Sequence, residues 1–178
     1  MDLQPGDIGA VQGRGFFGWL SRNLANPKTD RFHHFIVWGK MDSDYLILES
    51  IASKGLTMGK LSWYKDDDVI FYRVSCDQDL REMAPCGLID YGRSRYDYLL
   101  IIKVLSWALR AWVKMLFRGK LRKLSAEDFP YKPNRALVCT EAVETAYLSV
   151  GVQVIDPGVL PLPSAFKESE IQGKIYRI

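Results

Sequence analysis

The sequence predicts an α+β fold in which a small antiparallel sheet packs against helices. Up to residue 74, short apolar runs alternate with Gly, Asp and Ser, which is typical of strands joined by turns. From residue 79 onward, apolar residues recur mainly at helical spacing. Strands grouped first and helices grouped later favour α+β over a doubly wound sheet.

Length and composition indicate one globular domain spanning residues 1–178. A chain of 178 residues can bury a substantial core without disulfides or metals. Hydrophobic residues make up 48% and charged residues 25%, as in ordinary folded proteins. The net charge of +3 is too small to indicate a nucleic-acid partner.

The cysteines and the first residues favour a reducing compartment. Cys76, Cys86 and Cys139 are odd in number and widely spaced, which does not fit a disulfide framework. The first residues are polar and acidic, unlike a signal peptide. We therefore expect a cytoplasmic protein without a signal peptide, with export by another route, such as a phage-type lysis system, as the alternative.

Individual elements can be placed along the chain. Strands are expected at 8–11, 32–38, 45–51 and 69–74, because these segments are rich in β-branched and aromatic residues, with a strand-like end at 174–178. Helices are expected at 16–24, 79–89, 98–118 and 139–150. Gly151 is placed to cap the last of these helices.

Cys139 is the candidate nucleophile because it follows an extended stretch, 135–138, and opens a helix. Unpaired N–H groups and the positive end of the helix dipole would lower its thiol pKa and stabilise an oxyanion. The alternative is a structural cysteine on the apolar stripe of the helix.

His33 and His34 are the only histidines, and they are adjacent on a predicted strand. Successive side chains on a strand point to opposite faces, so His34 shares a face with Ile36, and His33 with Phe35. Either face fits the interior. A purely structural pair, one histidine packed and one exposed, is the alternative.

Glu49 is the candidate residue to orient an imidazole. It lies within the apolar run 46–51, on the expected neighbouring strand of a hairpin. A carboxylate in such a run is costly unless it is paired. The alternative is an edge strand that exposes Glu49 to water.

Five short motifs, taken in their order, resemble the circularly permuted NlpC-type hydrolases, bacterial and phage papain-like enzymes often called YiiX-like. The resemblance runs from about residue 5 to about residue 164. The motifs are Gly6-Asp7-Ile8, the run His34 to Trp38, Leu48-Glu49-Ser50, Tyr96-Asp97-Tyr98, and the run Val138 to Val143. The implied fold is a circularly permuted papain-like domain.

The resemblance implies a cysteine peptidase or amidohydrolase that needs no cofactor. Cys139 would be the nucleophile, His34 the general base and Glu49 the orienting group. The enzyme would cleave a peptide or acyl-amide bond through an acyl-enzyme. Asp7, Tyr96 and Asp97 match positions that are structural or line the pocket in the family, and Glu141 would stabilise the first turn of its helix.

Departures from the family pattern leave the substrate open. Phe35 and Ile36 replace small residues, Thr140 stands where Ser is common, and Ser50 replaces Ala. A lipid-directed thiol acyltransferase or esterase similar to the lecithin–retinol acyltransferase relatives is one alternative. A non-catalytic module that binds a membrane or a ligand is another. No Cys-x-x-Cys motif or spaced histidine pair indicates a metal.

A basic apolar segment at about 98–123 is the most unusual feature of the sequence. Its helical part is long enough to cross a bilayer, but Lys103, Arg110 and Lys114 interrupt it and disfavour spanning. Packing in the domain core or a dimer, contact with an anionic membrane, and docking of a partner all remain open. No groove-binding motif indicates nucleic acid. The oligomeric state is not predicted.

Overall fold

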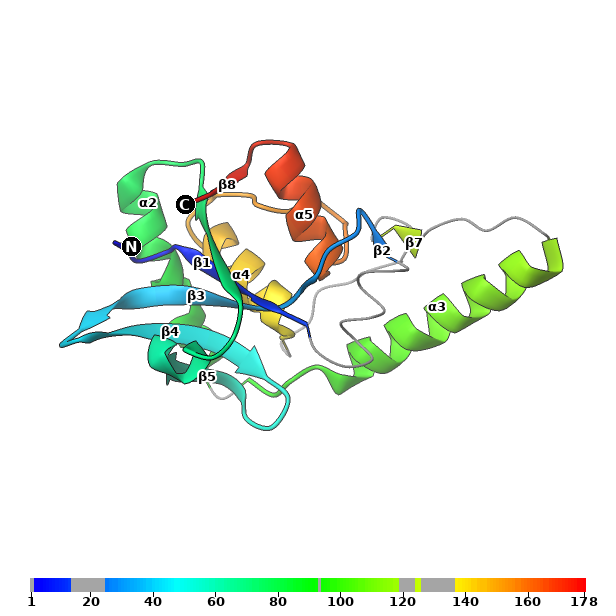
Figure 1. Cartoon of the computed structure of the whole chain (residues 1–178), viewed down its shortest axis with the longest axis horizontal. Helices are drawn as coiled ribbons and strands as arrows, with labels where there is room; N and C mark the ends of the chain where they lie inside the picture. Colours follow the sequence, from blue (N-terminus) through cyan, green and yellow to red (C-terminus); the bar gives the residue numbers. More distant parts are fainter. Residues whose placement is uncertain (1, 14–24, 93, 119–123, 126–136) are drawn as a thin grey trace.

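The computed structural model describes residues 2–13, 25–92, 94–118, 124–125 and 137–178. Six of its strands form one sheet in the order β5-β4-β3-β1-β6-β8, and every neighbouring pair is antiparallel (Figure 1). These strands are β1 (Ile8–Gln12), β3 (Arg31–Met41), β4 (Asp44–Ile51), β5 (Gly55–Lys60), β6 (Val69–Val74) and β8 (Ile175–Arg177). Two short parallel strands, β2 (Ala25–Asn26) and β7 (Leu124–Ser125), pair separately.

The α+β prediction is confirmed, and the predicted strands correspond to β1, β3, β4, β6 and β8. Strand β5 was not predicted because its sequence, GLTMGK, contains two glycines and only a short apolar alternation, at Leu56 and Met58. Pairing with β4 along its whole length makes it a strand. Tertiary pairing thus overrides a weak local preference.

The helices differ from the prediction in two places. The expected helix 79–89 is α2 (Gln78–Met83) followed by a 3₁₀ segment, η2 (Ala84–Tyr91), because Pro85 has no N–H to continue the α-helical bonds. In the proline-rich tail, α5 (Pro163–Ile171) was missed, although proline suits the first position of a helix. The expected helix 16–24 lies outside the described residues.

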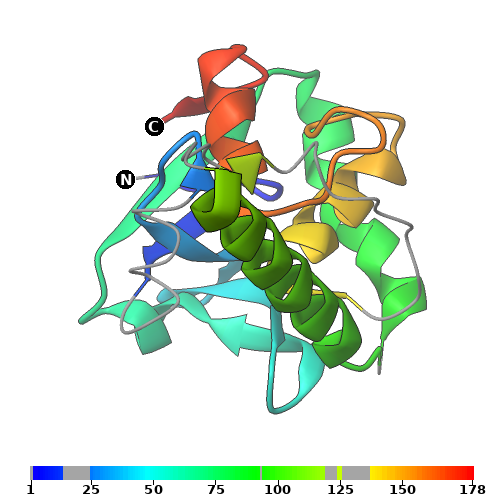
Figure 2. The ribbon, with the colours of Figure 1, turned by 90° about the vertical axis from the view of Figure 1, so that its right-hand side faces the viewer.

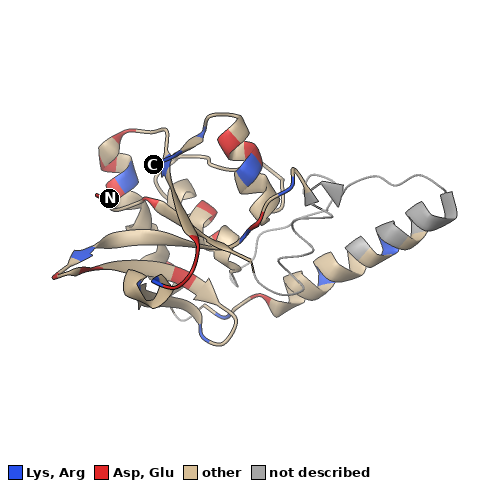
Figure 3. Ribbon diagram, in the orientation of Figure 1, with Lys and Arg blue, Asp and Glu red and all other residues tan. Residues whose placement is uncertain are grey.

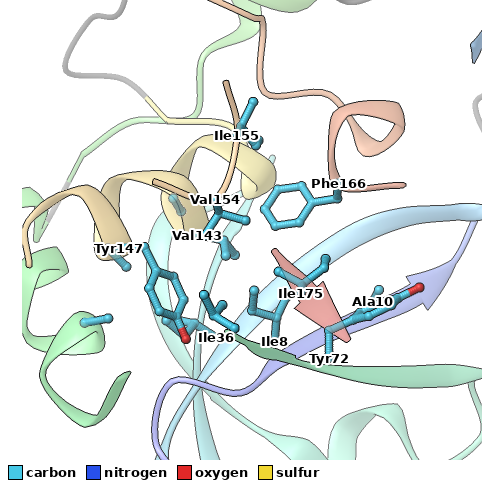
Figure 4. Close-up of a cluster of buried hydrophobic side chains, with 14 of the residues drawn as sticks. Ile8, Ala10, Ile36, Tyr72, Val143, Tyr147, Val154, Ile155, Phe166 and Ile175 are labelled. Carbon is cyan, nitrogen blue, oxygen red and sulfur yellow. The ribbon is translucent and has the colours of Figure 1, made fainter. Parts of the chain in front are cut away.

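Helix α4 (Cys139–Leu148) packs on the sheet and builds the main core. Its Val143 and Tyr147 pack with Ile8 and Ile36 of the sheet, and Phe166 of α5 belongs to the same core (Figure 4). Each fully buried side chain of this kind contributes about 1.5–3 kcal/mol to folding. Gly151 ends the helix with φ +77° and donates its N–H to the Leu148 carbonyl, as the sequence predicted.

A second, smaller core lies on the other face of the sheet. It contains Phe35, Val37 and Ile47, and Tyr64 of the 3₁₀ turn η1 (Leu61–Tyr64) packs against it. Strand β3 is therefore covered on both faces. As a result, both histidines on β3 lie in partly or fully buried surroundings.

The turn before β1 is fixed by buried polar contacts. The Tyr147 hydroxyl donates a hydrogen bond to the Gly6 carbonyl at 2.5 Å. Asp7 is fully buried and binds the Arg73 guanidinium through two bonds of 2.7 Å each. Gly6 has φ +88°, and a Cβ there would lie 2.2 Å from the Arg81 carbonyl oxygen. The structural role expected for Asp7 is therefore found.

Helix α3 (Tyr98–Arg118) has the predicted boundaries and projects away from the sheet and its covering helices (Figures 1 and 2). Asp97 accepts a bond from the Leu100 N–H at 2.8 Å and so caps the first turn. Leu100 packs with Val138 and Leu160. Among the described residues, no helix combines the length and hydropathy needed to span a membrane.

Candidate active site

Cys139 is the first residue of α4, and the residue before it is extended, as the sequence predicted. The Ser50 hydroxyl of β4 donates a 2.6 Å bond to the Leu137 carbonyl and so ties the extended segment to the sheet. The Glu141 carboxylate accepts a 2.8 Å bond from the Val138 N–H, which fixes the first turn. The helix-stabilising role expected for Glu141 is confirmed.

The sulfur of Cys139 lies against the start of strand β3. Its Sγ is 3.7 Å from the carbonyl oxygen of Phe32, the residue before His33. His33 and His34 both act on the Cys139 thiol and lower its pKa. The late helix therefore carries its cysteine to the early strand that bears the histidines, and both candidate bases reach the sulfur.

His33 is held by Glu49 of the neighbouring strand. Its Nε2 lies 2.8 Å from Oε2 of Glu49. The His33 side chain is 23% exposed, whereas that of Glu49 is only 2% exposed. The imidazole can therefore reach solvent or a substrate while its partner carboxylate stays buried.

The sequence predicted that Glu49 orients His34, and that pairing is wrong. The hairpin begins with Met41 opposite Asp44, a register that would set Glu49 opposite Ile36, on the face of His34. A register shift between Val37 and Gly39 instead sets Glu49 opposite Phe35. One extra residue thus moves the carboxylate to the face of His33.

His34 occupies the opposite face of β3, toward α4 and α5. It is almost fully buried, and its ring stacks on Phe166 with centroids 4.8 Å apart. Its Nδ1 has no hydrogen-bond partner among the described residues. His34 thus packs in the main core, and no carboxylate of the described residues pairs with it as Glu49 pairs with His33.

Tyr64 completes the contacts around Glu49, and the sequence did not single it out. Its hydroxyl donates a hydrogen bond to the same Oε2 that meets His33. Its ring stacks near that of His33, with centroids 5.9 Å apart and planes inclined by 20°. No local motif marks this tyrosine, because a 3₁₀ turn after β5 carries it to the site.

The electrostatics of the site favour a thiolate beside an imidazolium. Burial by itself raises the pKa of the Cys139 thiol, but hydrogen bonds and charge from His33 and His34 lower it to about 5. Burial by itself lowers the pKa of His33, but its bonds to Cys139 and Glu49 raise it to about 10. The two groups share one coupled titration, so they form an ion pair at neutral pH.

The surrounding groups support this charge state. Burial raises the pKa of Glu49, but hydrogen bonds from His33 and Tyr64 outweigh it, and the pKa falls below its usual range. Burial, together with the charge on Glu49, raises the pKa of Tyr64, which therefore stays a neutral donor. Burial and the charge on Cys139 raise the pKa of Tyr96, which is consistent with its expected place beside the pocket.

No cluster of three or more His, Cys, Asp or Glu side chains that could hold a metal ion occurs in the described part of the chain. The described acid–base groups at the site include those of Cys139, His33, His34, Glu49, Tyr64 and Tyr96. Comparison with models of protein families and with curated proteins finds no match for this chain.

Proposed function

We propose that the protein is a thiol hydrolase that cleaves an amide bond, of a peptide or an acyl-amide, through an acyl-enzyme on Cys139. One observation carries the proposal: a cysteine at a helix start lies against the start of the strand that bears His33, and Nε2 of His33 lies 2.8 Å from Oε2 of Glu49. Nucleophile, base and orienting carboxylate are the three groups that nucleophilic acyl transfer requires.

His33 is the general base in this proposal, in place of His34. Its Nε2 is engaged by Glu49, which leaves Nδ1 as the nitrogen that exchanges a proton at the sulfur. Partial exposure of His33 allows this nitrogen to reach a leaving group as well. His34 has a supporting role, since its effect on Cys139 also lowers the pKa of the thiol.

Acylation begins with the thiolate of Cys139 attacking the carbonyl carbon. The carbonyl π electrons move to oxygen, and N–H groups at the start of α4, which have no partners within the helix, lie beside the developing oxyanion. The C–N bond then breaks as the carbonyl re-forms. The leaving amine takes the proton of the His33 imidazolium, and a thioester remains on Cys139.

Deacylation uses the same groups, but His33 now acts as a base rather than as an acid. Neutral His33 removes a proton from water while the water oxygen attacks the thioester carbon. Collapse of the second tetrahedral intermediate releases the carboxylic acid and expels the thiolate, with the proton retained on His33. The resting ion pair is restored, and no cofactor is consumed.

A circularly permuted papain-like fold is part of the proposal. The order along the chain is histidine, carboxylate, cysteine, with the nucleophilic helix α4 after the sheet strands β1, β3, β4, β5 and β6. Three of the motifs that resemble permuted NlpC-type hydrolases contain Cys139, His34 and Glu49, whereas Gly6-Asp7-Ile8 lies near Tyr147 of α4. The antiparallel sheet with a cysteine-bearing helix on one face is compatible with such a fold.

The test is turnover of a panel of peptide amides, N-acyl amides and acyl esters by the full chain. Cys139→Ala and Cys139→Ser should reduce turnover to background, whereas Cys86→Ser, at an exposed cysteine, should leave it unchanged. Acyl-enzyme should be trapped on Cys139 as a mass increase equal to the acyl group. Wild-type turnover that survives in Cys139→Ala would refute the proposal.

The same assay separates hydrolysis from acyl transfer. Added alcohols or amines compete with water for the thioester, and the product ratio reports which acceptor the site prefers. A dominant transfer product would replace hydrolase with acyltransferase while leaving the role of Cys139 unchanged. A protein that forms no acyl-enzyme with any member of the panel would favour a non-catalytic binding module.

A further inference from the structure

Helix α3 leaves large apolar side chains uncovered along one face. Leu99, Ile102 and Leu109 are 68%, 61% and 62% exposed, and Val113 is also exposed. Their spacing of three, seven and four residues places them on one side of the helix. An apolar strip of this kind, interrupted by Ser106, on a projecting helix marks an interaction surface.

The opposite face of α3 is already used for packing. Leu100 is buried against Val138 and Leu160, and Val104 and Trp107 pack beside them. The first half of the helix is therefore anchored to the body of the protein with a fixed orientation. The exposed strip consequently lies on the side of the helix that faces away from these packing residues.

A basic edge runs along the apolar strip. Lys103 and Arg110 are exposed and lie seven residues apart, so they share one stripe, which borders the apolar strip at Leu99 and Val113. Figure 3 shows Lys and Arg along α3. The sequence contains no Asp or Glu between Tyr98 and Glu127. The surface that covers this face must therefore be both apolar and negatively charged.

We propose that the exposed face of α3 binds the surface of an anionic phospholipid membrane, with the helix lying in the interfacial plane. Acyl chains would cover Leu99, Ile102, Leu109 and Val113, while anionic headgroups would meet Lys103 and Arg110. A two-fold dimer through the same face would bring two identical basic stripes together without an acid to pair them. The lipid surface satisfies both requirements at once.

This membrane contact lies close to the candidate active site. Tyr96, two residues before α3, interacts electrostatically with Cys139, and Leu100 packs on Val138, the residue before Cys139. Binding through α3 would therefore hold Cys139 near the lipid surface. The binding itself does not depend on the hydrolase proposal, since it uses none of the catalytic groups.

The test is co-sedimentation of the full chain with vesicles of phosphatidylcholine alone and of an equimolar mixture with phosphatidylglycerol. We expect binding to the mixed vesicles, weaker binding to phosphatidylcholine, and a decrease with added salt. The double variant K103E/R110E should bind mixed vesicles with an affinity at least about ten-fold lower than that of the wild type. The double variant I102D/L109D should lose binding to both kinds of vesicle.

Two matched controls carry the same substitutions elsewhere on the surface. K40E/K65E changes the net charge equally, and I89D/I171D replaces equally exposed isoleucines, so both should bind like the wild type. Circular dichroism should show all four variants folded. Unchanged binding in the α3 variants, equal loss in the controls, or a dimer that I102D/L109D dissociates would overturn the proposal. Cys139→Ala should bind vesicles normally, which separates this test from that of the hydrolase.

Discussion

Nε2 of His33 and Oε2 of Glu49 lie 2.8 Å apart across strands β3 and β4, and the sulfur of Cys139 lies 3.7 Å from the carbonyl oxygen of Phe32, the residue before His33. The carboxylate is buried and the imidazole partly exposed. Loss of His33 would leave the Glu49 carboxylate buried without its partner, which is costly. Changes in this pair should therefore alter the pKa and the reactivity of the Cys139 thiol, both of which can be measured.

Replacing His33 should raise the pKa of the Cys139 thiol and reduce its reactivity more than replacing His34. In His33→Asn the thiol loses a hydrogen-bond donor and its charged neighbour, so its pKa should rise from about 5 toward the ordinary value. The rate of iodoacetamide alkylation as a function of pH reports this pKa, with Cys76 and Cys86 replaced by Ser. Turnover should fall by about 10²–10⁴.

His34→Asn is the matched variant for this experiment. It removes the second imidazole, which has no carboxylate partner in the described structure, so the alkylation midpoint should rise less. A larger rise in His34→Asn than in His33→Asn would return the role of base to His34.

The pH dependence of turnover should be bell-shaped with a broad plateau. Below a pH of about 5 the thiolate of Cys139 gains a proton and attack stops, so the rate falls as the pH decreases. Above a pH of about 10 His33 loses the proton that the leaving amine needs, so the rate falls as the pH increases. Steady-state kcat/KM between these limits checks the prediction. An acid limb centred near the pKa of a free thiol would contradict the ion pair.

Tyr64→Phe should weaken the site without unfolding it. The ring that stacks near His33 remains, but Glu49 loses the hydroxyl bond that helps to hold its pKa low. We expect kcat/KM to fall by about ten-fold, corresponding to about 1.4 kcal/mol, and the acid limb of the pH profile to move upward. Tyr45→Phe, in the same small core, is the control and should leave the profile in place. A drop in kcat/KM with an unmoved acid limb would indicate a packing effect only.

Ser50→Ala should destabilise the protein through the segment before Cys139. The buried Leu137 carbonyl would lose its 2.6 Å bond, which costs about 1–3 kcal/mol in the free energy of unfolding. Urea denaturation followed by circular dichroism measures this loss. Ser75→Ala removes a comparable side-chain bond to the Gly173 carbonyl at an exposed position and should change stability by less than about 0.5 kcal/mol. Equal effects in the two variants would show that the Ser50 bond has no special role.

Local features of the sequence were sufficient for much of the fold. The strands β1, β3, β4 and β6 and the helix α3 follow from short-range periodicity, which is encoded residue by residue. The start of α4 at Cys139 was predicted because an extended segment precedes a run of small and apolar residues. Strand β5 and helix α5 were not predicted, because neither has a strong periodic signal of its own.

The sequence by itself determined that His33 and His34 point to opposite faces of a strand and that Cys139 opens a helix. Which histidine meets Glu49 was decided only by the tertiary structure. The register shift between Val37 and Gly39 moves Glu49 by one position and therefore to the other face of the sheet. Strand register depends on pairing between segments, so no local pattern could fix it. The same holds for Tyr64, whose contact with Glu49 arises only when η1 folds back onto the sheet.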